Sequence, residues 1–231
     1  ALQPFNPSMG LMLESTSKVL YAHGGPHEFA PSKRPRVRLR TLELAGQLRV
    51  PFTTGILIGI GESRRDRIES LLAIAELSAQ YGHVQEVIVQ NFLSKADTAM
   101  EDSPNAETTE FLWTVAVARL ILGPDANLQV PPNLSAKNYQ IYLDAGINDW
   151  GGVSPLTPDF VNPEAPWPAL AELKTKTEAA GFQLKPRLPV YPEYFLNTKE
   201  FLPDSLLNKL SDMSDSEGYV QGGMQRYVSK V

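Results

Sequence analysis

The sequence predicts an α/β fold in which parallel strands alternate with helices. Two observations support this prediction. Apolar runs typical of buried strands alternate with amphipathic helical patterns, and 42% of the 231 residues are hydrophobic, enough for a sizeable core. We count five strand–helix units in strict alternation. That number fits either a doubly wound sheet or part of an eight-stranded (β/α) barrel.

Five short apolar runs predict the strands. They are rich in Val, Ile and Leu, and the second is nearly continuous, as in a strand buried on both faces. The predicted strands are Met9–Leu13, Phe52–Ile60, Val84–Val89, Leu128–Val130 and Ile147–Trp150.

Helical periodicity and terminal signals predict a helix after each strand. Ser63, with Asp66 three residues later, predicts a capped N-terminus, and Gly82 predicts the end of that helix. Gly46 is expected to stop the first helix and Ser135 to cap the fourth. The predicted helices are Pro35–Ala45, 63–82, Glu107–Leu122, one carrying Tyr139, Tyr142 and Leu143, and Ala169–Ala180.

The ends of the predicted strands favour the barrel. Polar residues, Gly or Pro follow every strand, and the loops after the strands of a barrel together line one site. Since a barrel needs eight units, about three more are expected upstream of residue 1. We therefore predict a partial barrel over residues 1–182, and over 183–231 an irregular, proline-rich C-terminal extension that packs on the same domain.

Composition excludes several classes of function. A net charge of −5 argues against a nucleic-acid partner, and the lack of an apolar run of roughly 18 residues argues against a membrane span. No secretory signal is recognisable, so we expect a cytoplasmic protein. The chain has no cysteine and three histidines, which excludes disulfides and thiolate nucleophiles and argues against a metal site. No serine stands in a G-x-S-x-G turn, which argues against hydrolysis through a nucleophilic serine.

The segment Gly55–Glu62 is the most informative local motif. It combines a buried strand, three glycines and the start of a helix. Glycines let the ring of a ligand lie against the backbone, and a helix N-terminus attracts negative charge. The alternative is a tight strand–helix turn without a ligand.

Charged residues near the first strand have two interpretations each. Glu14 could hold an ammonium group or ribose hydroxyls, or it could be a structural carboxylate that caps a helix or forms a salt bridge. Arg38 could bind a ligand carboxylate through two guanidinium nitrogens, although an arginine on a helix usually lies on the solvated face. The basic residues over 33–40 form either a solvated helix face or a patch on which an anionic ligand or partner docks. His23 and His27, in a loop, could be general bases, although loop histidines usually titrate in solvent.

The ends of the later strands supply amide, carboxylate and aromatic groups. Together they suit a heteroaromatic, hydroxylated ligand, although Trp150 taken alone is more often a core residue. The residues are Gln90, Asn91, Phe92, Asn133, Asn138, Asn148, Asp149, Trp150, Gly151 and Gly152.

Several segments together resemble one family, the 7,8-didemethyl-8-hydroxy-5-deazariboflavin synthases, which are radical S-adenosylmethionine (SAM) enzymes that close a deazaflavin ring. The stretch Ile147–Pro168 is the most specific. The segments that carry the resemblance are Leu11–Ser15, Pro51–Glu62, Val89–Phe92, Asp144–Pro158 and Val161–Pro168.

The resemblance implies a radical-SAM-type (β/α) barrel and a reaction. A reduced [4Fe–4S] cluster would split SAM into methionine and a 5′-deoxyadenosyl radical. That radical would take hydrogen from a 4-hydroxybenzyl adduct of 5-amino-6-ribitylaminouracil, and ring closure with loss of ammonia would follow. The implied partners are a paired radical SAM subunit and an electron donor such as ferredoxin or flavodoxin.

The resemblance also implies which residues bind. No proton-transfer residue is assigned, and Glu62, Asp149 and Glu164 are candidates. The residues expected to contact SAM are Glu14, Ser15, Arg38, Gly59, Ile60, Gln90, Asn91 and Phe92. Those expected to contact the substrate are Asn133, Asn148, Asp149, Trp150, Gly151, Gly152, Ser154 and Thr157.

One departure from the family pattern matters. The family holds its cluster with a C-x3-C-x2-C motif after the first barrel strand, whereas this chain has no cysteine. We therefore expect the C-terminal portion of such an enzyme, inactive alone. The alternatives are the reaction of the paired tyrosine-dependent subunit, a menaquinone-pathway relative, or a nucleoside-binding module without a cluster.

Overall fold

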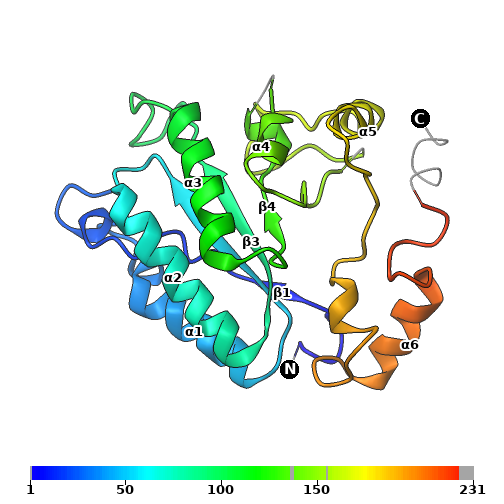
Figure 1. Ribbon diagram of the computed structural model, residues 1–231. Coiled ribbons are helices and arrows are strands. Elements are labelled where there is room, and N and C mark those ends of the chain that lie inside the picture. Colours follow the sequence, from blue (N-terminus) through cyan, green and yellow to red (C-terminus); the bar gives the residue numbers. More distant parts are fainter. Residues whose placement is uncertain (1, 136–137, 155, 224–231) are drawn as a thin grey trace.

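Figure 1 shows an α/β chain built around a parallel sheet with the strand order β1-β2-β3-β4. The computed structural model describes residues 2–135, 138–154 and 156–223. Each strand pairs in parallel with the next one along the chain, which is compatible with part of a (β/α) barrel. The strands are Met9–Gly10 (β1), Phe52–Ile58 (β2), Val84–Asn91 (β3) and Leu128–Gln129 (β4).

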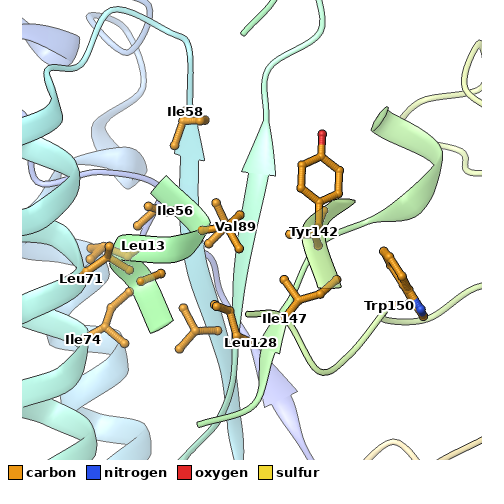
Figure 2. Close-up of a cluster of buried hydrophobic side chains, with 14 of the residues drawn as sticks. Leu13, Ile56, Ile58, Leu71, Ile74, Val89, Leu128, Tyr142, Ile147 and Trp150 are labelled. Carbon is orange, nitrogen blue, oxygen red and sulfur yellow. The ribbon is translucent and has the colours of Figure 1, made fainter. Parts of the chain in front are cut away.

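Three long helices cover one face of the sheet: Pro35–Gln47 (α1), Arg64–Tyr81 (α2) and Thr108–Leu122 (α3). Their apolar side chains interlock with every second strand residue, since side chains alternate between the faces of a strand. Figure 2 shows Leu71 and Ile74 of α2 close to Ile56 and other buried residues of the sheet. Each fully buried side chain of this kind contributes about 1.5–3 kcal/mol to stability.

The predicted ends of α2 are confirmed. The Ser63 backbone N–H donates to Asp66 Oδ2 at 2.8 Å, and the Asp66 N–H donates back to Ser63 Oγ at 3.2 Å. Gly82 ends the helix with a φ of +64°, a conformation that glycine adopts at little cost.

The expectation that Gly46 stops α1 is wrong, because the helix continues to Gln47. A Cβ atom on Gly46 would lie 2.6 Å from the ring of Tyr81. The glycine is therefore explained by the close approach of α1 to the end of α2, and not by a change of backbone direction.

The predicted fifth strand, Ile147–Trp150, is reduced to a single bridge between Asp149 and Gln129. Asn148 gives the physical reason. Its backbone N–H donates to the Leu128 carbonyl, but its side-chain oxygen accepts the Leu128 N–H at 2.7 Å. A side chain thus takes the place of one backbone hydrogen bond between the strands, and regular strand pairing ends there.

The second half of the chain has short helices. Ser135 lies in a 3₁₀ turn, the helix expected after it shortens to one turn, and residues 136–137 between them lie outside the described residues. The tail after Gly181 is not irregular throughout, because one helix packs Leu206, Leu207 and Leu210 into a second apolar cluster. These elements are α4 (Ile141–Asp144), α5 (Leu170–Ala179), α6 (Asp204–Met213) and the 3₁₀ turns Val19–Tyr21, Pro31–Lys33, Pro132–Ser135 and Pro192–Tyr194.

Within the described residues, no helix has both the length and the apolar character needed to cross a lipid bilayer.

His83, at the start of β3, makes stability depend on pH. The side chain is fully buried between Phe52 and Tyr81, and burial lowers its pKa below 6.5. Protons therefore bind the unfolded chain more tightly, so the free energy of unfolding should decrease as the pH falls below about 6.5. Urea unfolding between pH 7.5 and 5.5 measures this decrease, which H83L should reduce. An unchanged slope in H83L would contradict the assignment.

Candidate functional site

The carboxyl edge of the sheet gathers the strand-end residues that the sequence singled out. Glu14 pairs with Ile56 of β2 in a parallel bridge beyond the end of β1. The glycine turn follows β2, and Asn91 ends β3, so the three positions follow neighbouring strands. Consecutive parallel strands place their carboxyl ends on the same side, which is where α/β proteins bind ligands.

Glu14 is the centre of a buried group of charges. Its carboxylate lies 3.1 Å from His27 Nε2, 3.1 Å from Lys33 Nζ and 3.6 Å from Arg38 Nη2. Burial acts to raise the pKa of Glu14, but the hydrogen bonds from His27 and Lys33 and the charges of Lys33 and Arg38 outweigh it and lower the pKa. Glu14 is therefore an ion-paired carboxylate.

The backbone at Glu14 is also unusual. Its φ is +65°, a left-handed value that costs a non-glycine residue about 1–2 kcal/mol. Hydrogen bonds hold it on both sides, from Glu14 N–H to the Gly55 carbonyl and from Leu57 N–H to the Glu14 carbonyl. This fixed backbone aims the carboxylate at the loop over residues 18–38. Ser15, the next residue, is buried and accepts a hydrogen bond from the Ser17 N–H.

Two expectations about the charges near Glu14 are wrong. Arg38 is not on a solvated face: it is 8% exposed, and its guanidinium donates to the carbonyls of Ser32 and Met12. His27 is buried as well. His23, by contrast, is exposed and pairs with Glu28. The sequence predicts no contact of His27 or Lys33 with Glu14, because only the folded loop brings them there.

The glycine turn after β2 is held by a buried carboxylate. Glu62 accepts hydrogen bonds from the Gly59 N–H at 2.9 Å, the Ile60 N–H at 3.0 Å and Arg67 Nε at 2.8 Å. Gly59 has a φ of +92°, and a Cβ there would lie 2.6 Å from Ala106. The glycine pattern therefore builds the turn itself, and Glu62 is fully engaged in holding it.

The segment Gln90–Phe92, at the end of β3, lies at the same carboxyl edge of the sheet. Asn91 is buried and donates from Nδ2 to the Leu134 carbonyl at 2.8 Å. It lines a cavity of about 390 Å³ together with Phe111 and Tyr142. Gln90 is half-buried and lies on the face of the sheet opposite the helices, by the alternation of β3.

Most residues after the later strands form hydrogen bonds within the chain. Asn133 Nδ2 donates to Asp159 and to the Ala165 carbonyl, both at 3.0 Å. Trp150 is 5% exposed and donates to Thr177 Oγ1, so its alternative interpretation as a core residue is confirmed. Ser154 accepts hydrogen bonds from Thr157 within a local turn.

Asp149 is anchored by the tail of the chain. Arg187 Nε lies 2.5 Å from Asp149 Oδ2, and Arg187 Nη2 lies 2.6 Å from Glu86 Oε1. The Tyr191 hydroxyl donates to Asp149 at 2.6 Å. Burial raises the pKa of Glu86, aided by the charge of Asp149 and opposed by Arg187. Neither Arg187 nor Tyr191 was identified from the sequence, since both lie in the proline-rich tail.

A larger cavity of about 820 Å³ lies beside the residues expected to face the substrate. Trp150, Gly151 and Gly152 line one side, and α5 and the tail segment 182–193 line the other. Gly151 has a φ of +77°, which favours glycine, and a Cβ there would meet the end of the Gln129 side chain. The cavity therefore borders backbone at Gly151–Gly152 and aromatic surface at Trp150.

Replacing Glu14 by glutamine should destabilise the chain, because Arg38 would keep its charge in a buried place without a counter-charge. We expect E14Q to lower the free energy of unfolding by about 3 kcal/mol at pH 7, the usual cost of removing one partner from a buried pair. Because the folded pKa of Glu14 is lowered, its contribution is lost as the pH falls below 4.5, and the difference from wild type should shrink there.

Urea unfolding at pH 7 and at pH 4 checks this prediction. E43Q, which removes the exposed partner of Arg40, is the matched control and should change stability by less than about 1 kcal/mol. Equal effects of E14Q and E43Q at pH 7 would show that the buried charge group is not stabilising.

Comparison with known proteins places this geometry in context. No family model matches the chain. The chain is 52% identical over 220 residues to the 7,8-didemethyl-8-hydroxy-5-deazariboflavin synthase of Methanopyrus kandleri, covering 95% of this chain and 65% of that protein. It is 48% identical over 212 residues to the synthase of the same name from Methanothermobacter thermautotrophicus, of which it covers 63%.

A longer relative shows the same similarity. The chain is 52% identical over 217 residues to the FO synthase of Streptomyces coelicolor, covering 94% of this chain and 25% of that protein. The chain thus spans just under two thirds of the shorter relatives and a quarter of the longer one. Over nearly its whole length, the chain is a homologue of the 7,8-didemethyl-8-hydroxy-5-deazariboflavin synthases and corresponds to a part of them.

Proposed function

We propose that this chain forms the SAM- and substrate-binding part of a deazaflavin synthase. The reaction would be hydrogen abstraction from a 4-hydroxybenzyl adduct of 5-amino-6-ribitylaminouracil, followed by ring closure and loss of ammonia. The observation that carries the proposal is the 52% identity over 95% of the chain to a protein named for this product. The gathering of Glu14, Gly59 and Asn91 at one edge of the sheet supports it.

The residues present do not fit an iron–sulfur cluster. Such clusters are held by cysteine thiolates, and the chain has none. Within residues 2–135, 138–154 and 156–223, no group of three or more His, Asp or Glu side chains is arranged to hold a metal ion either. We therefore propose that the cysteine ligands lie in the part of the synthases that this chain does not cover.

The residues present do fit SAM. Glu14 offers a carboxylate to an ammonium or to ribose hydroxyls, and the cations beside it offer charge to a carboxylate. The turn at Gly59–Ile60 and the segment Gln90–Phe92 would flank the adenine. When bound, SAM would supply the 5′-deoxyadenosyl group that abstracts hydrogen. The chain's part is to fix the position of that group and to keep water away from it.

The cavity beside Trp150 is our proposed substrate region. Its mixture of aromatic surface, open glycine backbone and the anchored Asp149 suits a heteroaromatic, hydroxylated molecule. Glu62, Asp149 and Glu164 are the three candidates for proton transfer. Glu62 and Asp149 already accept hydrogen bonds from other residues of the chain. Glu164 is half-exposed and lies 4.0 Å from Lys95, so it remains the most available of the three.

The lack of cysteine favours one alternative, in which the chain alone is a nucleoside-binding module. The same geometry would then bind SAM without turnover. An activity test separates the two possibilities when the rest of a synthase is supplied.

The test is a chimera in which this chain replaces the matching part of the Methanopyrus kandleri synthase. After anaerobic cluster reconstitution and chemical reduction, with SAM and the adduct supplied, we expect 5′-deoxyadenosine and the deazaflavin by mass spectrometry. A chimera with its cluster cysteines replaced by alanine is the negative control. If the parent enzyme forms both products and the folded chimera forms neither, the proposal is wrong. If the chimera binds SAM without forming either product, the binding-module alternative is favoured.

A further inference from the structure

Two buried carboxylates share one cation on the face of the sheet opposite the helices. Arg187 Nη2 lies 2.6 Å from Glu86 Oε1, and Arg187 Nε lies 2.5 Å from Asp149 Oδ2. Among the described residues, no other charged side chain pairs with either carboxylate. The side chain of Glu86 is 6% exposed and that of Asp149 12%. If both were ionised, one negative charge would be left over in a buried place. Since such a charge is costly, we expect the group to hold one proton.

The hydroxyl of Tyr191 indicates which carboxylate holds that proton. It lies 2.6 Å from Asp149 Oδ2 and 3.2 Å from Glu86 Oε1. Burial and the two carboxylates raise the pKa of Tyr191, so the hydroxyl keeps its single hydrogen. The shorter distance assigns this hydrogen to Asp149. The contact with Glu86 is then a hydrogen bond only if Glu86 carries a proton and donates it to the Tyr191 oxygen.

The other donors agree with this assignment. Asp149 also accepts from the Gly151 N–H at 2.5 Å and from Arg187 Nε, contacts that favour its charged form. Glu86 meets Arg187 Nη2 and the hydroxyl of Thr53 at 3.0 Å. Burial and the charge of Asp149 nevertheless raise the pKa of Glu86, because together they outweigh the charge of Arg187.

We propose that Glu86 stores a proton and passes it through Tyr191 to Asp149, which delivers it to the substrate. The inference rests on the proposed function, in which the substrate loses ammonia. Asp149 and Tyr191 line the cavity of about 820 Å³, and Glu86 is connected to it through the Tyr191 hydroxyl. Asp149 is then the catalytic residue of this proton relay, and Glu86 and Tyr191 are the positioning residues that supply it.

Protons and electrons balance in this step. Asp149 Oδ2 takes the hydrogen of the Tyr191 hydroxyl, while the Tyr191 oxygen takes the hydrogen of Glu86. Asp149 then protonates the departing amine, whose nitrogen keeps the electron pair of the breaking C–N bond. Ammonia leaves, and one proton from solvent restores Glu86. Asp149 already accepts hydrogen bonds within the chain, but one of them comes from a hydroxyl that can itself pass a proton on.

Infrared spectroscopy of the full chain tests where the proton lies. At pH 7 we expect the carbonyl stretch of a protonated carboxyl group, which ¹³C-labelled glutamate should shift and ¹³C-labelled aspartate should not. E86Q should lose this band. Because the labels leave every side chain in place, the result does not depend on the folding of a variant. A band that follows the aspartate label, or the lack of any such band, would overturn the inference.

Turnover by the chimera with the Methanopyrus kandleri synthase tests the transfer. Y191F removes the connecting hydroxyl and keeps the ring. 5′-Deoxyadenosine should still form, because hydrogen abstraction precedes the loss of ammonia. The yield of deazaflavin per 5′-deoxyadenosine should fall about a hundredfold at pH 7, the lower end of what general acid catalysis contributes. This loss should shrink as the pH falls, since water can then protonate Asp149 directly.

Y194F is the matched control. It also removes a buried tyrosine hydroxyl, but one that donates to the Gly82 carbonyl outside the relay, and it should leave the ratio of the two products unchanged.

The outcomes separate the relay from the proposed function. If the ratio is unchanged in Y191F, or falls equally in Y194F, the relay is wrong while the proposed function stands. If the unsubstituted chimera folds and forms neither product although the parent enzyme forms both, the proposed function is wrong and the relay falls with it. The labelled infrared bands then still decide whether Glu86 holds a proton.

Discussion

Parallel pairing of β2 with β3 is the constraint on which the rest of the structure depends. Consecutive parallel strands need a long crossover, so the chain must travel back over the sheet, and α2 makes that passage with its apolar side on the strands. The same pairing places the carboxyl ends of both strands at one edge. Asn91 pairs with Ile58, so it lies next to the turn that begins at Gly59.

Two buried carboxylates stabilise that edge by the same physical rule. A carboxylate removed from water needs several donors, and both Glu14 and Glu62 have them. They differ in where the donors come from. Backbone N–H groups and Arg67 enclose Glu62, so it fixes a turn. Side chains meet Glu14, and one of them, Lys33, is partly exposed.

The face of the sheet opposite the helices is closed by the tail. Glu86 lies on that face, and Arg187 bridges it to Asp149 while Tyr191 bonds to both. This contact joins residues about a hundred positions apart in the sequence and fixes Asp149 at the start of the Gly151–Gly152 backbone. The tail is thus part of the scaffold for the proposed substrate region, although its own proline-rich sequence carries no sign of that role.

Features that depend on short-range chemistry can be predicted from the residues alone: the alternation of elements, the cap at Ser63, the end of α2 at Gly82 and the polar character of the strand ends. Tertiary structure decided the rest. Gly46 allows α1 to pack closely against the end of α2, and the Asn148 side chain takes the place of a strand hydrogen bond. Glu14 meets His27 and Lys33 from a loop without periodicity and Arg38 from α1. Periodicity and capping report the backbone preferences of neighbouring residues, whereas the partner of a buried charge is chosen by packing between segments far apart in the chain.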